Sequence, residues 1–429
     1  MKIIRYPERD RWEELCKRPS ISRPELHKTV SGILKSVRGN GDKALYELAE
    51  RFEGFRPNDL KVSEDEIRAS AALIPYELKE AIRTAQANIT RFHEAQLREE
   101  PVIETSAGVR CWRKNIPIGR VGLYIPGGTA PLFSTVLMLA VPARIAGCRE
   151  IIICTPPDKA GSINPLILYS ALSAGVTRIF RAGGAQGIAA MAYGTETIPK
   201  VDKIFGPGNQ YVTLAKELVQ AEGTAIDIPA GPSEVLVIAG RDSDPSFVAA
   251  DLLSQAEHGI DSQVVLLTES PEFPDKVITE IQNQILSLPR REIALRALEN
   301  SMAIILGTAG ECIDFSNQYA PEHLIISTSD YAALAADVSC AGSVFLGKYS
   351  CESAGDYASG TNHTLPTAGY ARSYGGVSAE SFVKKITFQE ISPEGISKLG
   401  PVIERMAEAE QLQAHRNAVT IRLNSIEND

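Results

Sequence analysis

The sequence predicts an α/β protein with two similar domains, each built around a parallel β-sheet. Two series of short strands, glycine-rich turns and helices, over residues 121–219 and 235–346, are typical of repeated β-α-β units. The chain of 429 residues is also too long for one ordinary hydrophobic core, so at least two domains are expected. Hydrophobic residues at 44% and charged residues at 23% place the chain among ordinary globular proteins.

The first hundred residues are expected to be helical. Residues 24–37 have a helical spacing that stops at the turn signal Gly39-Asn-Gly41. Ser63 and Glu66 form the pattern of a capping box, which predicts the start of another helix. Apolar residues then recur every three or four positions over residues 74–92, which indicates a long amphipathic helix. It carries His93, which we expect to be solvated or at the edge of the core.

The first α/β series follows residue 109. Strands are expected at residues 121–125, 151–154, 178–180 and 201–205, with helices at 132–146, 166–174, up to 193, and 212–219. Glycine-rich turns at residues 124–128, 183–187 and 206–209 join strands to helices. Such turns can hold a pyrophosphate on exposed N–H groups, but they are equally compatible with plain tight turns. The Gly-x-Gly-x-x-Gly fingerprint of dinucleotide binding is absent from this sequence.

The second series has the same texture. Strands are expected at residues 235–238, 264–267, 303–306, 324–326 and 343–346, and helices at 245–258, 273–288, 314–319 and 331–338. A glycine-rich stretch at residues 355–376 leads to a helical C-terminal segment that Pro393 and Pro401 interrupt. The two similar series suggest a duplication of architecture, although no repeat is visible at the level of residues.

Charge and cysteine content limit the partners. A net charge of −9 argues against nucleic acid, and no apolar run reaches the roughly 18 residues that span a bilayer. The first residues lack the apolar core of an export signal, so we expect a cytoplasmic protein. The seven cysteines form no Cys-x-x-Cys pair, which argues against a disulfide framework and a thiolate zinc site. Any metal is therefore expected on nitrogen and oxygen ligands.

Four of the six histidines lie in polar contexts that also contain acids or amides. They are His258, His323, His363 and His415. Imidazole is the commonest metal ligand in proteins and changes its protonation near neutral pH. Each histidine alone is more simply explained by a structural role, but the four contexts together indicate a metal site or proton-transfer chemistry.

Spacing relates some of these residues to one another. Gln255 and His258 are three apart near the end of a predicted helix, about 60° apart around its axis, so both can reach one ion. Asp356 is expected in a glycine-rich loop that can deliver its carboxylate into a cleft. Glu410 and His415 are five apart, about 140° around a helix, and meet at one site only if the helix ends or distorts between them.

Adjacent acid and base residues indicate proton transfer. Glu322 and His323 follow a proline before a predicted strand, where neighbouring side chains diverge and can each serve a separate proton transfer. A polar loop before the strand explains the pair equally simply. At the junction of the two series, a Gly/Pro turn presents Ser233 and Glu234 where a cleft between domains is expected.

These motifs together resemble the histidinol dehydrogenase family over nearly the whole chain. The matching segments are Tyr124-Ile-Pro-Gly-Gly128, Pro131-Leu-Phe-Ser-Thr135, Gly183-Gly-Ala-Gln186, Gly206-Pro-Gly-Asn209, Pro229-Ala-Gly-Pro-Ser-Glu234, Ser254-Gln-Ala-Glu-His258, Ala320-Pro-Glu-His323, Gly355-Asp-Tyr-Ala-Ser-Gly-Thr-Asn-His363 and Glu410-Gln-Leu-Gln-Ala-His415. Cys351, just before Glu352, is the one place where a local departure from the family is suspected.

The resemblance implies a zinc-dependent and NAD-dependent four-electron oxidation of L-histidinol to L-histidine, through L-histidinaldehyde. It implies one zinc ion per subunit on Gln255, His258, Asp356 and His415, and catalysis by Glu322 and His323. The implied substrate contacts are Ser233, Gln255, His258, His323, Asp356, His363, Glu410 and His415. The implied NAD contacts are Tyr124, Gln186 and Asn209.

The resemblance also implies a fold of two similar Rossmann-like domains with incomplete dinucleotide-type sheets, plus small N-terminal and C-terminal helical segments. The expected divisions are residues 1–22, an N-terminal helical extension; 23–122 with 234–376, the metal and catalytic domain; 123–233, the NAD-binding domain; and 377–429, a dimerisation segment. It further implies a homodimer whose sites are shared between subunits. Two alternatives stay open: a related NAD-dependent dehydrogenase of another small alcohol or diol, and a zinc hydrolase.

Overall fold

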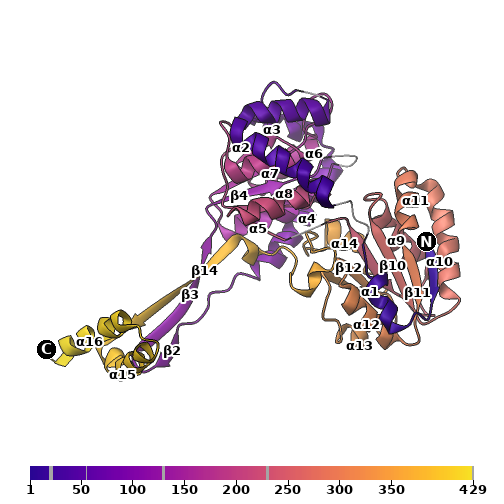
Figure 1. The fold of residues 1–429 in the computed structure, drawn as a ribbon. Coiled ribbons are helices and arrows are strands. Elements are labelled where there is room, and N and C mark those ends of the chain that lie inside the picture. The colour runs from indigo at the N-terminus through magenta and orange to yellow at the C-terminus, as the bar shows by residue number, and fades with distance from the viewer. Residues whose placement is uncertain (19–22, 55, 128–130, 229–230, 428–429) are drawn as a thin grey trace. The chain divides into compact units, whose positions relative to one another are not determined.

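The computed structural model divides into two compact units, which are described separately here (Figure 1). The described residues are 1–18, 23–54, 56–127, 131–228 and 231–427. The larger unit comprises Met1–Gln96 and Ile118–Phe382, and the smaller unit comprises Leu97–Pro117 and Val383–Asp429. The larger unit contains two separate parallel sheets, so the predicted α/β class with two similar sheets is confirmed.

The first sheet of the larger unit is five-stranded, in the order β6-β5-β4-β7-β8, and all its pairings are parallel. Its strands are β4 (Arg120–Tyr124), β5 (Glu150–Thr155), β6 (Arg178–Arg181), β7 (Lys203–Phe205) and β8 (Ala225–Ile226). The helices that connect them are α5 (Phe133–Ala146), α6 (Pro165–Ala174), α7 (Gly184–Tyr193) and α8 (Gln210–Ala221). Apart from β8, for which no strand was predicted, each of these elements lies within a few residues of its predicted position, because the alternation of apolar runs and glycine turns is strong here.

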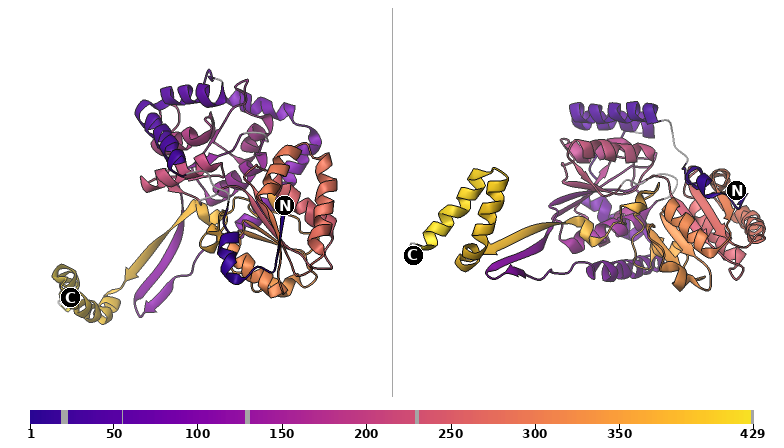
Figure 2. Two further views of the ribbon diagram at one scale, coloured as in Figure 1. Left: turned by 45° about the vertical axis from the view of Figure 1, so that its right-hand side comes forward. Right: turned by 60° about the horizontal axis from the view of Figure 1, so that its bottom comes forward.

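The helices of residues 23–96 pack onto the helices α5–α8 that cover this first sheet. They are α2 (Arg23–Glu53), α3 (Glu64–Ser70) and α4 (Tyr76–Glu94). A short 3-10 helix, η2 (Ala71–Leu73), lies between α3 and α4. Leu26, Val30 and Leu34 of α2 share a buried cluster with Ile188 of α7, and α2 runs beside α7 and α8 (Figure 2). The expected grouping of residues 23–122 with residues 234–376 is therefore wrong for α2 and α3, because these helices pack against α6, α7 and α8 of the first sheet.

Three local predictions in this region have clear outcomes. The predicted helix end at Gly39-Asn-Gly41 is confirmed, because the backbone at Gly41 is non-helical (φ 53°) and α2 consists of two helical segments joined by a kink there. The predicted cap is confirmed, since the Ser63 hydroxyl accepts from the N–H of Glu66 at 3.1 Å. His93 is fully buried and not solvated, with Nδ1 2.9 Å from the carbonyl oxygen of Ile89.

The second sheet is six-stranded and parallel, in the order β1-β11-β10-β9-β12-β13. Its strands are β1 (Lys2–Arg5), β9 (Glu234–Ile238), β10 (Gln263–Thr268), β11 (Met302–Ile305), β12 (His323–Ile326) and β13 (Ser343–Leu346). Its helices are η1 (Arg9–Arg11), α1 (Trp12–Leu15), α9 (Pro245–Ala256), α10 (Phe273–Gln284), η3 (Ile285–Ser287), α11 (Arg291–Glu299), α12 (Ala309–Tyr319), α13 (Tyr331–Ala335), α14 (Glu352–Tyr357), η4 (Tyr370–Arg372) and η5 (Ala379–Phe382). One buried cluster joins α9–α11 to the sheet and another joins α1, α12 and α13 to it.

We had expected a purely helical N-terminal segment, and this prediction was wrong. Residues Lys2–Arg5 pair with Met302–Ile305 and add an edge strand to the second sheet. Apart from β1, both sheets have the same strand order when their strands are numbered from the first to the fifth, namely 3-2-1-4-5. That order is the first five positions of the doubly wound dinucleotide-binding sheet, so the predicted Rossmann-like and incomplete character is confirmed.

The smaller unit is built from an antiparallel sheet and two helices. Its elements are β2 (Ile103–Ser106), β3 (Val109–Pro117), β14 (Val383–Ile391), α15 (Pro393–Ala409) and α16 (Gln413–Glu427). The C-terminal segment is therefore only partly helical, because Val383–Ile391 pairs with Val109–Pro117 along its whole length. Pro393 opens α15 and Pro401 lies inside it, where we had expected interruptions.

Among the described residues, no helix is long and apolar enough to cross a membrane. The most apolar helices, α5, α6 and α7, have 14, 10 and 10 residues. A spanning helix needs roughly 20 residues. Their apolar character instead reflects burial on the first sheet, as the central position of α5 and its many buried side chains indicate.

Candidate active site

The candidate catalytic residues lie at the amino ends of two neighbouring strands of the second sheet. Glu322 immediately precedes β12 and His323 is its first residue, while Glu234 is the first residue of β9. The two strands are paired with His323 opposite Val235. Both candidate side chains are bonded to the peptide groups of Glu234, because its N–H donates to Glu322 Oε2 at 2.8 Å and its carbonyl oxygen lies 3.1 Å from His323 Nδ1.

These contacts determine the protonation pattern of His323. A carbonyl oxygen only accepts hydrogen bonds, so Nδ1 carries the proton and Nε2 keeps its lone pair. Nε2 is buried without a hydrogen-bond partner and lies 3.7 Å from Asp356 Oδ1. Burial lowers the pKa of His323, although the charge of Asp356 opposes this shift. The ring is therefore a neutral imidazole whose free nitrogen can accept a proton.

Glu322 is suited to act as a base of unusually high proton affinity. The side chain is buried beside His323, with Oε2 3.8 Å from His323 Nδ1. Burial raises its pKa well above the ordinary value, while the N–H of Glu234 lowers it and the charges of Glu234 and Asp356 raise it further. A carboxyl group whose pKa is moved toward neutrality is typical of general acid–base catalysis.

A group of possible metal ligands adjoins this pair. One ligand atom each from His258, Glu352 and Asp356 lies within 4.8 Å of the others. His258 follows the end of α9 and keeps an exposed edge, but the surrounding protein desolvates its ring and lowers its pKa. Asp356 lies on the short helix α14 and not in a loop, so our expectation of a glycine-rich loop was wrong. The helix starts at Glu352, four residues before Asp356, and so presents both carboxylates on one face.

Gln255 belongs to the same cluster through Glu352. Both side chains are 1% exposed. With its amide nitrogen toward Glu352, Gln255 donates to the carboxylate, at 3.0 Å from Oε2. This orientation turns the amide oxygen of Gln255 away from Glu352, and such an oxygen can serve as a metal ligand. Glu352 was not among the predicted site residues, although its position four residues before Asp356 was a usable signal.

The electrostatics of this cluster fit a bound cation. Burial raises the pKa of Glu352 well above normal, and the charges of Asp356, Glu322 and Asp251 raise it further. Burial alone raises the pKa of Asp251 to about 7. Asp356 Oδ1 is buried without a hydrogen-bond partner. Converging carboxylates with an unpartnered oxygen, beside imidazole and amide donors, are the donor set that a divalent metal such as zinc accepts.

His363 and Ser233 lie around this cluster in different ways. His363 Nδ1 is 3.0 Å from the carbonyl oxygen of Asp356, and its Nε2 is 3.1 Å from Thr135 Oγ1 at the start of α5. Thr135 thus links the first sheet's helix to the candidate site. Ser233 immediately precedes β9, and its carbonyl oxygen accepts from the N–H of Gln263 at 3.2 Å.

The three predicted NAD contacts lie at the carboxyl ends of the first sheet's strands. Tyr124 ends β4, and its hydroxyl accepts from the N–H of Gly184 at 2.9 Å. Gln186 is in the first turn of α7, and Asn209 caps α8 by accepting from two backbone N–H groups. The strand order reverses between β4 and β7, and in open α/β sheets ligands bind in the crevice at such a point. Residues 128–130 and 229–230 of the predicted turns lie outside the described residues.

Glu53 is a further polar group at this edge that the sequence did not reveal. It ends α2, lies 3.5 Å from the amide nitrogen of Gln186, and its Oε2 is buried without a hydrogen-bond partner. Burial raises its pKa to about 7. Glu53, Gly127 and Pro156 line a cavity of about 650 Å³. The cavity and the unpartnered oxygen fit a polar ligand with a hydroxyl group, such as the ribose of a dinucleotide.

Glu410 and His415 belong to the smaller unit and are described within it. Glu410 is the C-terminal cap of α15, and His415 lies in the first turn of α16. Gln411 between them has a positive φ of 59°, so the helix ends and a new one begins at this point. The condition under which the two residues can serve one site, an interruption between them, is therefore met.

Comparisons with known proteins agree with this architecture. The family model described as histidinol dehydrogenase matches residues 16–423. A histidinol dehydrogenase of Bacteroides thetaiotaomicron is 57% identical over 426 residues, which cover 99% of this chain and 100% of that protein. One from Escherichia coli is 52% identical over 416 residues, covering 96% and 95%. The crystal structure of histidinol dehydrogenase from Elizabethkingia anophelis superposes with a TM-score of 0.96 at 53% identity, covering 100% of this chain and 99% of that one. The chain belongs to the histidinol dehydrogenase family and is a dehydrogenase.

Proposed function

We propose that this dehydrogenase catalyses the last two oxidations of histidine biosynthesis, from L-histidinol through L-histidinaldehyde to L-histidine. One molecule of substrate and one water deliver two hydrides to two molecules of NAD in succession and release three protons. The observation that carries the proposal is the convergence of His258, His323, Asp356 and Glu322 in one cluster. Family membership supports the identity of the substrate.

We assign one zinc ion per subunit to Gln255, His258, Asp356 and His415. Zinc has no redox chemistry of its own and, when bound, acts as a Lewis acid that orients the imidazole and amine of the substrate. The amide oxygen of Gln255, which is turned away from Glu352, and the unpartnered Oδ1 of Asp356 support this assignment. The carboxylate of Glu352 accepts a hydrogen bond from the amide nitrogen of Gln255 and so orients the amide.

His323 and Glu322 divide the proton transfers. His323 removes the alcohol proton through its free Nε2 as hydride leaves the carbon for the nicotinamide. Glu322 takes a proton from the water that attacks the aldehyde, and the resulting gem-diol then loses the second hydride. The neutral ring of His323 and the raised pKa of Glu322 suit these two roles.

The remaining contacts position the two ligands. Ser233, His363 and Glu410 hold polar groups of L-histidinol, together with the four zinc ligands and His323. Tyr124, Gln186 and Asn209 contact NAD at the edge of the first sheet. The arrangement supports a division in which residues 123–233 bind NAD and residues 234–376 carry the metal and the catalytic groups.

We further propose a cytoplasmic homodimer in which Glu410 and His415 of the partner subunit complete each site. All seven cysteines are unpaired, as a reducing compartment requires. Two inactive variants, Gln255→Ala and His415→Ala, should regain part of the activity when mixed under conditions that exchange subunits. In a mixed dimer one site has lost both ligands and the other has lost neither. Absence of any recovery, with exchange verified by a tag, would count against shared sites.

The proposal is tested by counting NADH formed per L-histidinol consumed. Two NADH per substrate, abolished by a chelator and restored by zinc, is the expected result. One NADH per substrate would indicate a dehydrogenase that releases the aldehyde. No NADH would direct attention to another small alcohol or diol, and hydrolysis without NADH would indicate a zinc hydrolase.

A further inference from the structure

The two candidate bases share one point of attachment in the protein. The N–H of Glu234 donates to Glu322 at 2.8 Å, and the carbonyl oxygen of Glu234 accepts from His323 at 3.1 Å. Both bonds come from the first residue of β9, where the sheet begins. A shift of the peptide groups of Glu234 therefore moves both bases together.

The side chain of Glu234 is anchored by an arginine from the N-terminal segment. Arg18 donates to both carboxylate oxygens, from Nε at 2.9 Å and from an η nitrogen at 3.0 Å. The N–H of Ala368 adds a third bond at 2.8 Å. Glu234 is 2% exposed and the Arg18 side chain 13% exposed. A two-point bond between buried charges fixes the direction of the carboxylate as well as its place.

Arg18 is in turn held on several sides. It donates to the carbonyl oxygens of Cys16 and Tyr319, both at 2.8 Å, and its guanidinium lies 3.5 Å from the centre of the Tyr319 ring. The hydroxyl of Tyr319 donates to Gln263 Oε1 at 2.7 Å. Arg18 thus connects the end of α12 and the start of β10 to the residue that holds the two bases.

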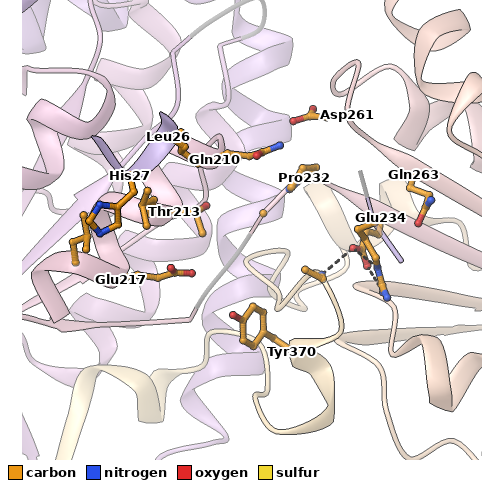
Figure 3. A pocket seen from close by; sticks show the side chains of 15 residues that line it. Leu26, His27, Gln210, Thr213, Glu217, Pro232, Glu234, Asp261, Gln263 and Tyr370 are labelled. Atoms are coloured by element: carbon orange, nitrogen blue, oxygen red, sulfur yellow. Dashed lines mark hydrogen bonds and ion pairs between the residues drawn. The ribbon is translucent and has the colours of Figure 1, made fainter. Parts of the chain in front are cut away.

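A cavity borders the Arg18–Glu234 pair. It has a volume of about 410 Å³, and Glu234, Gln263 and Tyr370 are among the residues that line it (Figure 3). The dashed lines in Figure 3 mark the bonds of Glu234 on its wall. Arg18 lines the same cavity, so shortening its side chain would open the Glu234 carboxylate to water from this side.

We propose that the Arg18–Glu234 pair is a positioning device that holds Glu322 and His323 in their working geometry. This inference rests on the roles assigned to those two bases under the proposed function. Arg18 acts through Glu234 and contacts neither base in this chain. A displacement of about 1 Å can cost about a hundredfold in rate, so a small movement of the Glu234 peptide is sufficient to slow catalysis.

The test compares Arg18→Met and Arg18→Lys with a control, Arg38→Met. Arg38 forms an ion pair of similar length, 3.0 Å to Glu222, but both side chains are exposed. We expect Arg18→Met to lower kcat about 10- to 100-fold for both alcohol and aldehyde oxidation, with the KM for L-histidinol and the zinc content within twofold of wild type. Arg18→Lys keeps the positive charge but cannot form the two-point bond of a guanidinium group, so its kcat should lie between those of wild type and Arg18→Met. The control should retain the wild-type kcat.

Rates are expressed per folded molecule, with the folded fraction measured by circular dichroism. A purely structural role predicts an unchanged kcat per folded molecule, and this result in either Arg18 variant would overturn the inference. If Arg18→Met does not fold, Arg18→Lys decides the question alone. Wild-type enzyme is assayed first: failure to form two NADH per L-histidinol rejects the proposed function, whereas normal stoichiometry with unaffected Arg18 variants rejects only the positioning role.

Discussion

Replacing Glu322 with Gln separates the two oxidations from each other. The amide has nearly the shape of the carboxyl group and can still accept the 2.8 Å bond from the N–H of Glu234, so the fold and the neighbouring His323 should be preserved. The amide cannot take a proton from water. General-base assistance is worth about 10²- to 10⁴-fold, or about 3–5 kcal/mol of barrier. We therefore expect aldehyde oxidation to fall by that factor and alcohol oxidation to fall less than about fivefold.

The two steps are measured in separate single-turnover reactions that start from L-histidinol and from L-histidinaldehyde. Formation of NADH is followed by absorbance. Glu292→Gln, on the exposed part of α11, is the matched control and should leave both rates unchanged. Equal losses in the two steps of Glu322→Gln would refute the division of roles between Glu322 and His323.

Three further changes test other parts of the structure. Lys216 is 2% exposed, forms an ion pair with Asp227 and donates to two backbone carbonyl groups at 2.9 and 3.1 Å. Lys216→Met should therefore lower the free energy of unfolding, measured in urea, by about 3–5 kcal/mol. Adding Asp227→Asn should recover part of this loss. Burial raises the pKa of Glu53 from 4.5 to about 7, so the stability of the folded state falls as pH rises from about 4.5 to 7. Glu53→Gln should therefore stabilise the protein at pH 8 by about 1–2 kcal/mol, after a discount for partial solvent screening, and should not stabilise it at pH 4. Glu352→Ala removes the partner of the Gln255 amide and should weaken zinc binding about 10- to 100-fold in a chelator competition, whereas unchanged affinity would show that Glu352 does not hold Gln255.

The α/β series was predictable because its strands are buried on both faces and its turns contain glycine. Such strands read as short apolar runs, and the strands of the two parallel sheets other than β1 and β8 were found within a few residues of their expected places. The exceptions are instructive. Val383–Ile391 contains β-branched and aromatic residues, but its side chains are mostly exposed and do not alternate cleanly, so its strand signal is weak and its pairing with Val109–Pro117 makes it a strand. Lys2–Arg5 is a strand for the same reason, through its pairing with Met302–Ile305.

The site was predictable only in part, because sequence patterns report on neighbours along the chain. Glu322, His323 and His258 stood out by their residue types, and the structure brings them together with Asp356. Arg18 could not be found in this way. It is 216 positions from Glu234, and neither residue has a neighbour that marks the pair. Contacts of this range depend on the sheet order, which no local pattern encodes.

The candidate functional residues of the two sheets lie at opposite ends of their strands, although the two sheets share one strand order. In the first sheet the glycine turns follow the strands, so the candidate NAD contacts lie at the carboxyl ends, near the reversal between β4 and β7. In the second sheet, Glu234 and His323 are the first residues of their strands. The bond between Thr135 of α5, the helix after β4, and His363 joins these two edges at 3.1 Å. A hydride donor at one edge and an acceptor at the other need such a junction, which supports placing the redox step there.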